Sequence, residues 1–310
     1  MRAGIPGEQR DTHAAQGPCV DGGGHAVQGS SGPAGRIGLA RCATVRDAMR
    51  YRLLCLDAGF TLLSPRRSLA DALSGVLAED GHEITEDELR AAWEASDQWF
   101  WDEYHRPGND TWSDDARIEE YWRRYHGVML ERLGLADRRE VLDRILASQF
   151  APETWELYPD VEPMLTAVRE MGLRIGIVSD WGSNLRGIVS ELGLDRYLDF
   201  VLPSGAVGVA KPNPAFFAMA LEHAGTAPAE ALMVGDSYRA DVRGAWSAGM
   251  DAVWLDRSEG ISITPPTEPP PADVRVIASL NELPEIIRDG GPLPRGADAA
   301  PVVADNPAGA

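Results

Sequence analysis

The chain has 310 residues, of which 44% are hydrophobic, so it is long enough for a core domain with an insertion and too apolar to be disordered throughout. Its 48 acidic residues outnumber 29 basic ones, which gives a net charge of −19. This charge repels phosphate backbones and anionic lipid, and therefore argues against nucleic-acid and membrane partners. There is no run of about 18 apolar residues, no signal-peptide pattern and no metal or disulfide spacing among the three cysteines. These features predict a soluble, cytoplasmic protein.

The two ends of the chain lack any helical or strand period. Residues 1–48 are rich in Gly, Ala and Ser, and residues 290–310 in Pro, Gly and Ala, so both segments are predicted to be disordered tails. Met49 stands just before the first apolar run and is a candidate for the native start. Pro265–Pro271 is predicted to be a loop.

Between the tails, short apolar runs alternate with helical patterns. Asp160 is expected to cap one helix, and Asn213, followed by Pro214, to start another that ends at Gly225. Apolar runs of this length suit strands that are buried on both faces of a parallel sheet. They are Leu53–Leu56, Ile175–Val178, Leu232–Val234, Ala252–Leu255 and Val274–Ile277. The alternation predicts an α/β fold with a Rossmann-like, doubly wound parallel sheet.

Residues 65–151 interrupt this alternation with a pattern that is helical, poor in strands and rich in aromatic residues. The chain is therefore predicted to consist of a core, residues 49–64 plus 152–289, and an all-helical insertion, residues 65–151. The aromatic residues are expected mainly to pack between helices. Four insertion residues are nevertheless candidates for substrate contact: Arg66, Trp99, Trp101 and Tyr104.

Polar residues follow the predicted strands at their carboxyl ends, where open α/β sheets bind their ligands. Asp57 follows the first strand, and Ser179 and Asp180 follow the second. Asp236 follows the third core strand, with Asp241 in the next helical turn. These ends lie side by side in such a sheet, so the carboxylates are expected to gather in one small volume.

A cluster of carboxylates requires a positive partner. Oxygen-rich coordination selects a hard cation, most often Mg²⁺. Lys211 is the single lysine among the 29 basic residues and can serve as a point charge at the same place. Mg²⁺ and a lysine together suit a dianionic group such as phosphate, and a hydroxyl from Ser179 or Thr61 can complete the cradle.

These residues resemble the four motifs of the haloacid dehalogenase (HAD) superfamily of hydrolases. The motifs occur in order as Asp57–Thr61, Ser179, Lys211-Pro212 and Gly235–Asp241, and the resemblance covers about residues 52–289. The helical insertion stands where that superfamily carries a helical cap. Each motif is weak alone, but four in the correct order are specific.

The resemblance implies a role for each matching residue. Asp57 would be a nucleophile that forms an aspartyl-phosphate intermediate, which water then hydrolyses. Lys211 would hold Asp57 and the transferring group, and Ser179 would bind a phosphoryl oxygen. Asp180 would contribute a substrate contact or form an exposed turn. The implied Mg²⁺ ligands are Asp57, the carbonyl of Gly59, Asp236 and Asp241.

The sequence departs from the phosphatase pattern at Gly59, where the superfamily's phosphatases usually carry a second Asp as general acid and base. That help is typically worth about 10²–10⁴-fold in rate. Phe60 is a smaller departure, because the pattern usually has Gly there.

Three functions are therefore ranked: a Mg²⁺-dependent phosphatase, a 2-haloacid dehalogenase whose halide leaving group needs no proton, and a catalytically weakened binding protein. A Schiff-base hydrolase is excluded because the insertion contains no lysine. Either a monomer or a homodimer is compatible with the sequence.

Overall fold

The computed structural model describes residues 49–67, 69–257, 274–291 and 293–295. The predicted tail over residues 1–48, the predicted loop Pro265–Pro271 and most of the predicted C-terminal tail lie outside the described residues. The part of that tail that is described makes contacts, since Leu293 packs against the core and Arg295 hydrogen-bonds Asp251.

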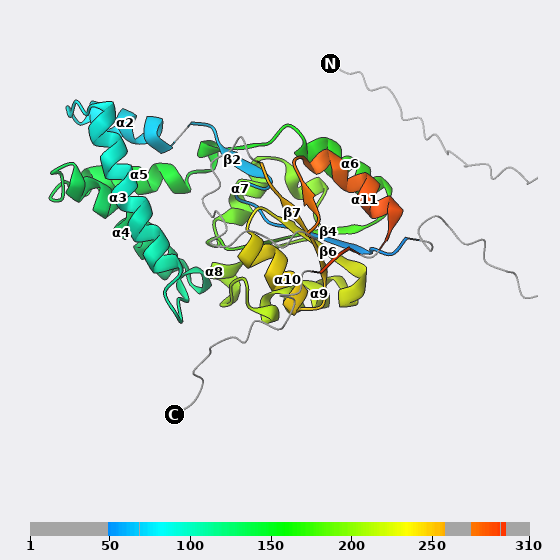
Figure 1. Cartoon of the computed structure of the whole chain (residues 1–310). Coiled ribbons are helices and arrows are strands. Elements are labelled where there is room, and N and C mark those ends of the chain that lie inside the picture. Colours follow the sequence, from blue (N-terminus) through cyan, green and yellow to red (C-terminus); the bar gives the residue numbers. More distant parts are fainter. Residues whose placement is uncertain (1–48, 68, 258–273, 292, 296–310) are drawn as a thin grey trace, which may run out of the picture. The chain divides into compact units, whose positions relative to one another are not determined.

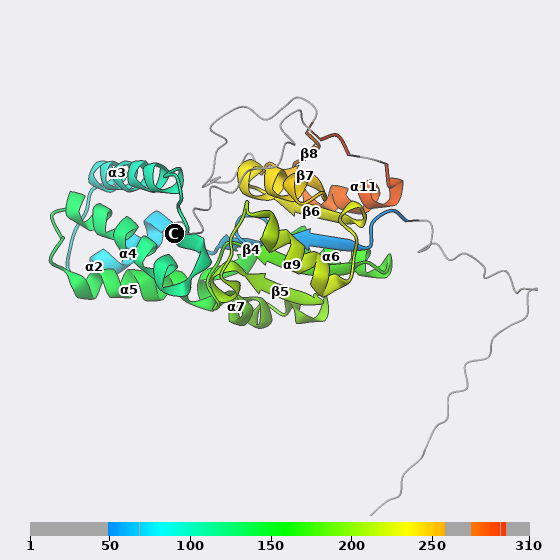
Figure 2. The same ribbon diagram turned by 90° about the horizontal axis from the view of Figure 1, so that it is seen from below.

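A parallel sheet forms the centre of the described structure (Figures 1 and 2), which confirms the predicted fold class. Its strand order is β5-β4-β1-β6-β7-β8. The strands are β1 (Leu53–Leu56), β4 (Arg174–Ser179), β5 (Phe200–Pro203), β6 (Ala231–Gly235), β7 (Asp251–Leu255) and β8 (Val276–Ile277). β1 lies between β4 and β6, with Leu56 opposite Ile177 and Val234. Because β1 is central, the residue that follows it is surrounded by the ends of its neighbours.

The side chains of β1 alternate between two hydrophobic clusters, one on each face of the sheet. Leu54 and Leu56 join the cluster formed with α6, α7 and α11, whereas Leu53 and Cys55 join the cluster formed with α9 and α10. Figure 1 shows α6 and α11 on one side of the sheet and α9 and α10 on the other. Burial on both faces explains why the strands are continuously apolar.

Helices follow the strands as the alternation predicts. They are α6 (Val161–Glu170), α7 (Leu185–Glu191), α8 (Ser204–Val207), α9 (Pro214–Ala224), α10 (Gly244–Ser247) and α11 (Leu283–Asp289). Short helical turns are η2 (Pro152–Thr154), η3 (Leu194–Arg196), η4 (Pro228–Glu230), η5 (Tyr238–Arg243) and η6 (Leu280–Glu282). Asn213 caps α9 by accepting from the Ala215 N–H, and Gly225 ends it in the left-handed region, as expected.

Asp160 does not act as the cap that its position suggests. It precedes α6, but its side chain makes no capping hydrogen bond there. Its carboxylate instead binds the Arg257 guanidinium and accepts from the Ser279 hydroxyl and the Leu280 N–H. The prediction was wrong because these partners lie about a hundred residues away in the sequence.

The described residues between the first strand and α6 form mainly helices. These are α2 (Leu69–Glu79), α3 (Glu86–Tyr104), η1 (Thr111–Ser113), α4 (Asp115–Arg132) and α5 (Arg139–Phe150). α3 begins with a capping box between Thr85 and Glu88. Phe100, Tyr121 and Tyr125 lie in a hydrophobic cluster shared by these helices, so the aromatic residues do pack between helices. We refer to α2–α5 and η1 as the helical cap.

Two short strands connect the helical cap to the core. β2 (Leu63–Pro65) pairs antiparallel with β3 (Trp155–Leu157), and Leu63 lies opposite Leu157. The chain thus leaves and re-enters the core at adjacent points.

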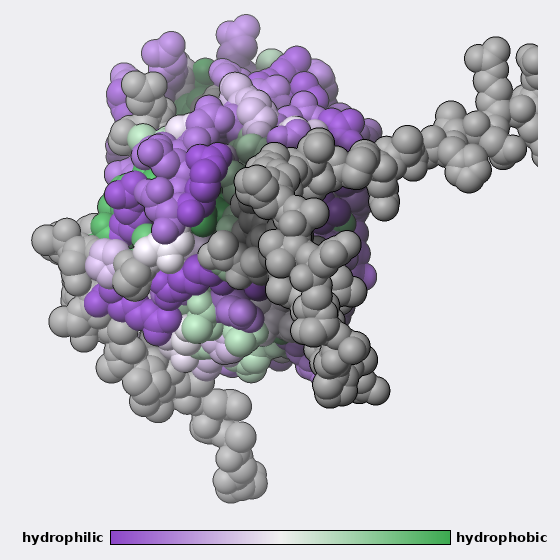
Figure 3. All heavy atoms as spheres, turned by 90° about the vertical axis from the view of Figure 1, so that its right-hand side faces the viewer, coloured by the Kyte–Doolittle hydropathy of each residue, from purple (hydrophilic) through white to green (hydrophobic). Residues whose placement is uncertain are grey.

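The surface of the described core is mainly polar. Hydrophilic residues predominate on the face shown in Figure 3, which is the right-hand side of Figure 1 where α11 lies. Val276, at 42% exposure, is the large hydrophobic residue that stands out among those described. Within the described ranges, no helix is both long and apolar enough to cross a membrane.

Candidate active site

Asp57 occupies the centre of the site because it directly follows the central strand. Its N–H donates to the carbonyl oxygen of Val234 at 3.0 Å, which continues the pairing of β1 with β6. Asp57 is 7% exposed and lines a cavity at the carboxyl ends of the strands. Its carboxylate is therefore fixed in direction but accessible to a small molecule.

Lys211 joins two of the carboxylates. Its Nζ lies 2.6 Å from Asp57 Oδ1 and 2.7 Å from Asp241 Oδ1, and its side chain is 3% exposed. Burial alone would lower the pKa of Lys211, but the charges of Asp241, Asp57 and Asp180 outweigh this effect and raise that pKa well above its ordinary value. The neighbouring carboxylates therefore favour the charged ammonium form of Lys211.

Asp236 and Asp241 come from β6 and the turn after it. Asp236 follows the strand, and Asp241 lies in η5, a π-helical turn of the kind often found at functional sites. Asp241 Oδ2 accepts from the Ser237 N–H at 2.9 Å. Its carboxylate lies so close to Gly235 that a Cβ at residue 235 would overlap it. Glycine at this position is therefore required by the approach of Asp241.

The three carboxylates form a group with too little positive charge. Oxygen atoms of Asp57, Asp236 and Asp241 all lie within 4.8 Å of one another. Burial, and then the charge of Asp57, raise the pKa of Asp236 well above its ordinary value. Burial also raises the pKa of Asp241, to about 6, against the opposing effect of Lys211. An all-oxygen donor set with this excess of negative charge fits a hard divalent cation such as Mg²⁺.

Ser179 and Asp180 follow β4 and line the same cavity. Ser179 is 2% exposed. Asp180 Oδ1 accepts from the Lys211 N–H at 2.9 Å, so this carboxylate positions the backbone of the lysine loop. Burial raises the pKa of Asp180 to about 7, although Lys211 opposes the shift. The structure thus places Asp180 at the site and not in an exposed turn.

Thr61 lies near the site but does not line the cavity. The residue is fully buried, and its hydroxyl donates to Asp236 Oδ1 at 3.1 Å. Its carbonyl oxygen accepts from the Arg257 guanidinium at 2.9 Å. The expectation that Thr61 contacts substrate is therefore corrected: its hydroxyl is directed at Asp236 and orients that carboxylate.

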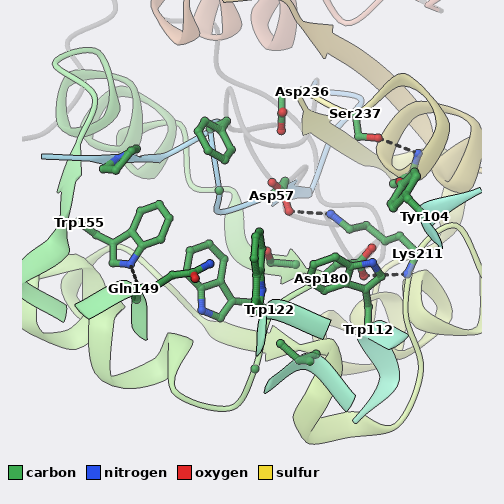
Figure 4. A pocket seen from close by; sticks show the side chains of 18 of the residues that line it. Asp57, Tyr104, Trp112, Trp122, Gln149, Trp155, Asp180, Lys211, Asp236 and Ser237 are labelled. Atoms are coloured by element: carbon green, nitrogen blue, oxygen red, sulfur yellow. Dashed lines mark hydrogen bonds and ion pairs between the residues drawn. The ribbon is translucent and has the colours of Figure 1, made fainter. Parts of the chain in front are cut away.

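The cavity has a volume of about 160 Å³, with polar groups at one end and aromatic groups elsewhere. Figure 4 shows Asp57, Asp236 and Lys211 on one side and Trp112, Trp122 and Trp155 on the other. We call the aromatic lining the aromatic wall. Its members are Phe60, Phe100, Tyr104, Trp112, Trp122, Phe150, Trp155 and Trp181. Among the described residues that line this cavity, Lys211 is the only cation.

One of the four cap residues singled out in the sequence lines the cavity. Tyr104 lines the cavity, its phenol interacts with Ser237, and Arg239 lies 5.6 Å from the centre of its ring. Trp99 and Trp101 pack within the cap cluster and do not line the cavity, and Arg66 instead pairs with Glu156. The helical period places these residues on a helix but does not say which face meets the core.

Gly59 and Trp181 occupy the place where the phosphatase pattern has its second Asp. A Cβ on residue 59 would lie 3.1 Å from Cζ3 of Trp181, which is tighter than an ordinary contact. The Trp181 ring packs edge-on against Trp155, with 4.7 Å between ring centres. Trp181 was missed at the sequence level, although its position two residues after Ser179 placed it beside the site. Space for an acid side chain at residue 59 is thus taken by an indole ring.

A parallel core, a helical insertion after its first strand and a lysine-bridged carboxylate cluster at the strand ends together define a hydrolase of the HAD type. The sequence profile of the haloacid dehalogenase-like hydrolases matches residues 51–249, and the chain belongs to this family. The resemblance inferred from the four motifs is thereby confirmed.

Two relatives illustrate the range of the family. Haloacid dehalogenase-like hydrolase domain-containing protein 3 of Mus musculus is 32% identical over 221 residues, which cover 68% of this chain and 84% of the mouse protein. Phosphoserine phosphatase of Thermus thermophilus is 38% identical over 161 residues, which cover 51% of this chain and 63% of that enzyme.

A solved structure agrees with the fold. The HAD hydrolase YfnB of Bacillus subtilis, solved with bound magnesium, superposes with a TM-score of 0.58 at 21% identity. The match covers 77% of this chain and 99% of YfnB. At this identity the likeness concerns the fold alone.

Proposed function

We propose that this hydrolase is a Mg²⁺-dependent phosphatase that acts on a small phosphorylated molecule through a covalent intermediate on Asp57. The observation that carries the proposal is the group of three carboxylates within 4.8 Å of one another, bridged by Lys211 in a cavity at the strand ends. Such a site binds a dianion only if positive charge is added, and a metal-bound phosphate satisfies that condition.

The proposed reaction assigns each residue a task. An Asp57 carboxylate oxygen attacks phosphorus, and the bond from phosphorus to the leaving oxygen breaks with its electron pair on that oxygen. Water then hydrolyses the aspartyl phosphate, which releases phosphate and restores the carboxylate. Lys211 holds Asp57 in position and neutralises charge on the transferring group, and Ser179 hydrogen-bonds a phosphoryl oxygen. Asp180 positions Lys211, because its carboxylate accepts a hydrogen bond from the backbone N–H of Lys211.

The residues that would hold Mg²⁺ are Asp57, Asp236 and Asp241, with the Gly59 carbonyl as a further oxygen ligand. The ion would supply charge neutralisation for the phosphoryl group. Thr61 then serves as a positioning residue because its hydroxyl donates to Asp236. The relatives lend support, since the Thermus enzyme is named a phosphoserine phosphatase.

The test is hydrolysis of p-nitrophenyl phosphate and of acetyl phosphate, with Mg²⁺ and after EDTA. We expect release of phosphate that requires Mg²⁺ and that disappears in Asp57→Asn. The matched control is Asp137→Asn, which alters an exposed carboxylate in the α4–α5 loop that does not line the cavity. Activity that survives Asp57→Asn would remove the nucleophile assignment.

A dehalogenase is the second candidate because Gly59 offers no acid and a halide leaving group needs no proton. Its test is chloride release from 2-chloropropionate. Release of chloride in EDTA, without phosphate release from either ester in Mg²⁺, would favour it over the phosphatase. The excess of carboxylates is the observation that places the phosphatase first.

The remaining predictions belong to the same proposal. We infer that residues 49–64 plus 152–289 act as the catalytic core and residues 65–151 as a cap that selects the substrate. A cytoplasmic location and a monomeric or homodimeric state are part of the proposal.

A further inference from the structure

The lining of the cavity restricts which phosphate esters fit. Beyond the carboxylates and Lys211, it is dominated by the aromatic wall. Its other polar side chains include Gln149 of α5, Thr154 of η2 and the Tyr104 hydroxyl, which interacts with Ser237. A charged substituent on the organic part of the substrate would lose its hydration against the aromatic wall without gaining an oppositely charged partner, and this desolvation is costly. The organic part of the substrate must therefore be uncharged and largely apolar.

The size of the cavity narrows the choice further. Its volume is about 160 Å³, and an apolar protein cavity of roughly 150 Å³ accommodates benzene. Aromatic faces on several sides favour a planar ring, since ring pairs gain about 0.5–1.5 kcal/mol beyond the burial of area. One aromatic ring thus matches the chemistry of the wall, and a small group suits a cavity whose volume also holds the phosphoryl group beside Asp57.

The Trp181 ring adds a requirement on the leaving group. It lies next to Gly59, where a Cβ would approach the ring to 3.1 Å, and the glycine itself offers no acid. Asp180 also lines the cavity, and its Oδ1 accepts from the Lys211 N–H. A ring oxygen leaves as a resonance-stabilised aryl oxide and takes its proton later from water, whereas an alkyl oxygen needs the proton as it leaves.

We propose that the substrate class of this site is a phosphate monoester of an uncharged aryl group, in which the ester oxygen is attached directly to a single aromatic ring. This inference rests on the proposed phosphatase function. Asp57 attacks phosphorus, the bond between phosphorus and the aryl oxygen breaks, and the aryl oxide leaves with the electron pair. Water hydrolyses the aspartyl phosphate as in any other substrate.

The test compares kcat/KM for four probes in Mg²⁺: phenyl phosphate, benzyl phosphate, O-phosphoserine and acetyl phosphate. Benzyl phosphate keeps the ring but has an alkyl leaving oxygen, and acetyl phosphate has a good leaving group without a ring. We expect kcat/KM for phenyl phosphate to exceed that for phosphoserine by at least about 10²-fold and that for benzyl phosphate by at least about tenfold. Differences of this size are expected when general acid catalysis is missing.

A wall variant separates recognition of the ring from the chemical step. Trp122→Ala should lower kcat/KM for phenyl phosphate about tenfold and leave acetyl phosphate within about twofold, because the acetyl group is too small to reach the wall. Trp93→Ala is the matched control, since Trp93 packs in the cap cluster but does not line this cavity. Retained turnover of acetyl phosphate also shows that the variant is folded.

Two outcomes are distinguishable. Turnover of acetyl phosphate together with equal or faster turnover of phosphoserine or benzyl phosphate would overturn the aryl assignment and keep the phosphatase. No Mg²⁺-dependent turnover of any probe would overturn both. Equal decreases in kcat/KM for phenyl phosphate and acetyl phosphate in Trp122→Ala would show that the aromatic wall does not recognise the ring.

Discussion

Lys211 is the residue whose chemistry is least replaceable. One compact ammonium group contacts Asp57 at 2.6 Å and Asp241 at 2.7 Å in a site where its side chain is 3% exposed. A planar, forked guanidinium cannot occupy the same position. We expect Lys211→Arg to lower kcat/KM for p-nitrophenyl phosphate by about 10²–10³-fold, the usual effect of losing one charge-stabilising group. Wild-type rates in a folded Lys211→Arg protein would mean that the contacts of Lys211 with Asp57 and Asp241 do not contribute to catalysis.

Gly59 and Trp181 form a pair that should be changed together. In Gly59→Asp alone the new Cβ meets the Trp181 ring at 3.1 Å, so we expect lower activity on every ester. In Gly59→Asp with Trp181→Ala the acid gains space, and turnover of benzyl phosphate should rise at least about tenfold over Trp181→Ala alone. The measurement is kcat/KM for benzyl and phenyl phosphate in the three variants. A gain in the single variant would show that the ring does not exclude the acid.

Phe60 has a conformational cost that glycine would not have. Its φ is +55°, in the left-handed region that disfavours side chains by about 1–2 kcal/mol. We expect Phe60→Gly to fold with at least the stability of the parent in urea denaturation, but to lose part of the preference for phenyl phosphate because one ring of the wall is removed. A clear loss of stability would show that packing of the ring outweighs the backbone cost.

At the residue scale, the sequence was most informative where a motif fixes the position of a side chain along a strand end. Asp57, Ser179, Asp236 and Asp241 were found in this way because strand ends in a parallel sheet are neighbours. Lys211 lies in the loop before α9 and was found as the single lysine of the chain. Thr61 was misjudged because a hydroxyl can face either the ligand or a neighbouring carboxylate. Trp112 and Trp122 were not identified as lining residues, since helical periodicity does not fix how a helix is rotated against another domain.

At the element scale, α4 and α5 are connected by a buried histidine, His126 of α4. His126 is 3% exposed, and its Nε2 lies 2.6 Å from Gln149 Oε1. Burial lowers the pKa of His126 from 6.5 to about 4. Between pH 6.5 and about 4, His126 is therefore protonated in the unfolded chain but neutral in the folded chain.

The stability of the protein should depend on pH accordingly. The contribution of His126 is complete above pH 6.5 and is lost as the pH falls toward 4, by an amount of about 3 kcal/mol. We expect His126→Gln to flatten the free energy of unfolding between pH 6.5 and 4, measured by urea denaturation. His223→Gln, at an exposed position in α9, is the control and should keep the slope of the parent. An unchanged slope in His126→Gln would assign the pH dependence to other groups.

Elements defined by long-range pairing were the hardest to predict. β5 is a four-residue strand at the edge of the sheet, and its partner β4 lies twenty residues earlier. β2 and β3 are three residues each and pair across the whole cap, so neither has a local signal. The central strands β1, β4, β6 and β7 were predicted correctly because burial on both faces makes their composition unambiguous.

At the scale of the whole molecule, Asp251 joins the two ends of the described chain. The Tyr51 hydroxyl donates to Asp251 at 2.7 Å, and the carboxylate also pairs with Arg50 at 2.7 Å and Arg295 at 3.2 Å. The Asp251 side chain is 1% exposed, whereas Arg50 and Arg295 are 27% and 36% exposed. Either arginine can therefore compensate the buried charge when the other is removed.

This redundancy predicts that the two arginines are not independent. Arg50→Ala and Arg295→Ala should each lower the free energy of unfolding by no more than about 1 kcal/mol, because each is a partly exposed ion pair. The double variant leaves Asp251 buried without a cation and should lose about 2–3 kcal/mol beyond the sum of the two, as coupled groups do. Urea denaturation of the four proteins measures this coupling. Strictly additive losses would mean that the two ends of the chain are attached to the core independently, with Tyr51 alone satisfying the carboxylate.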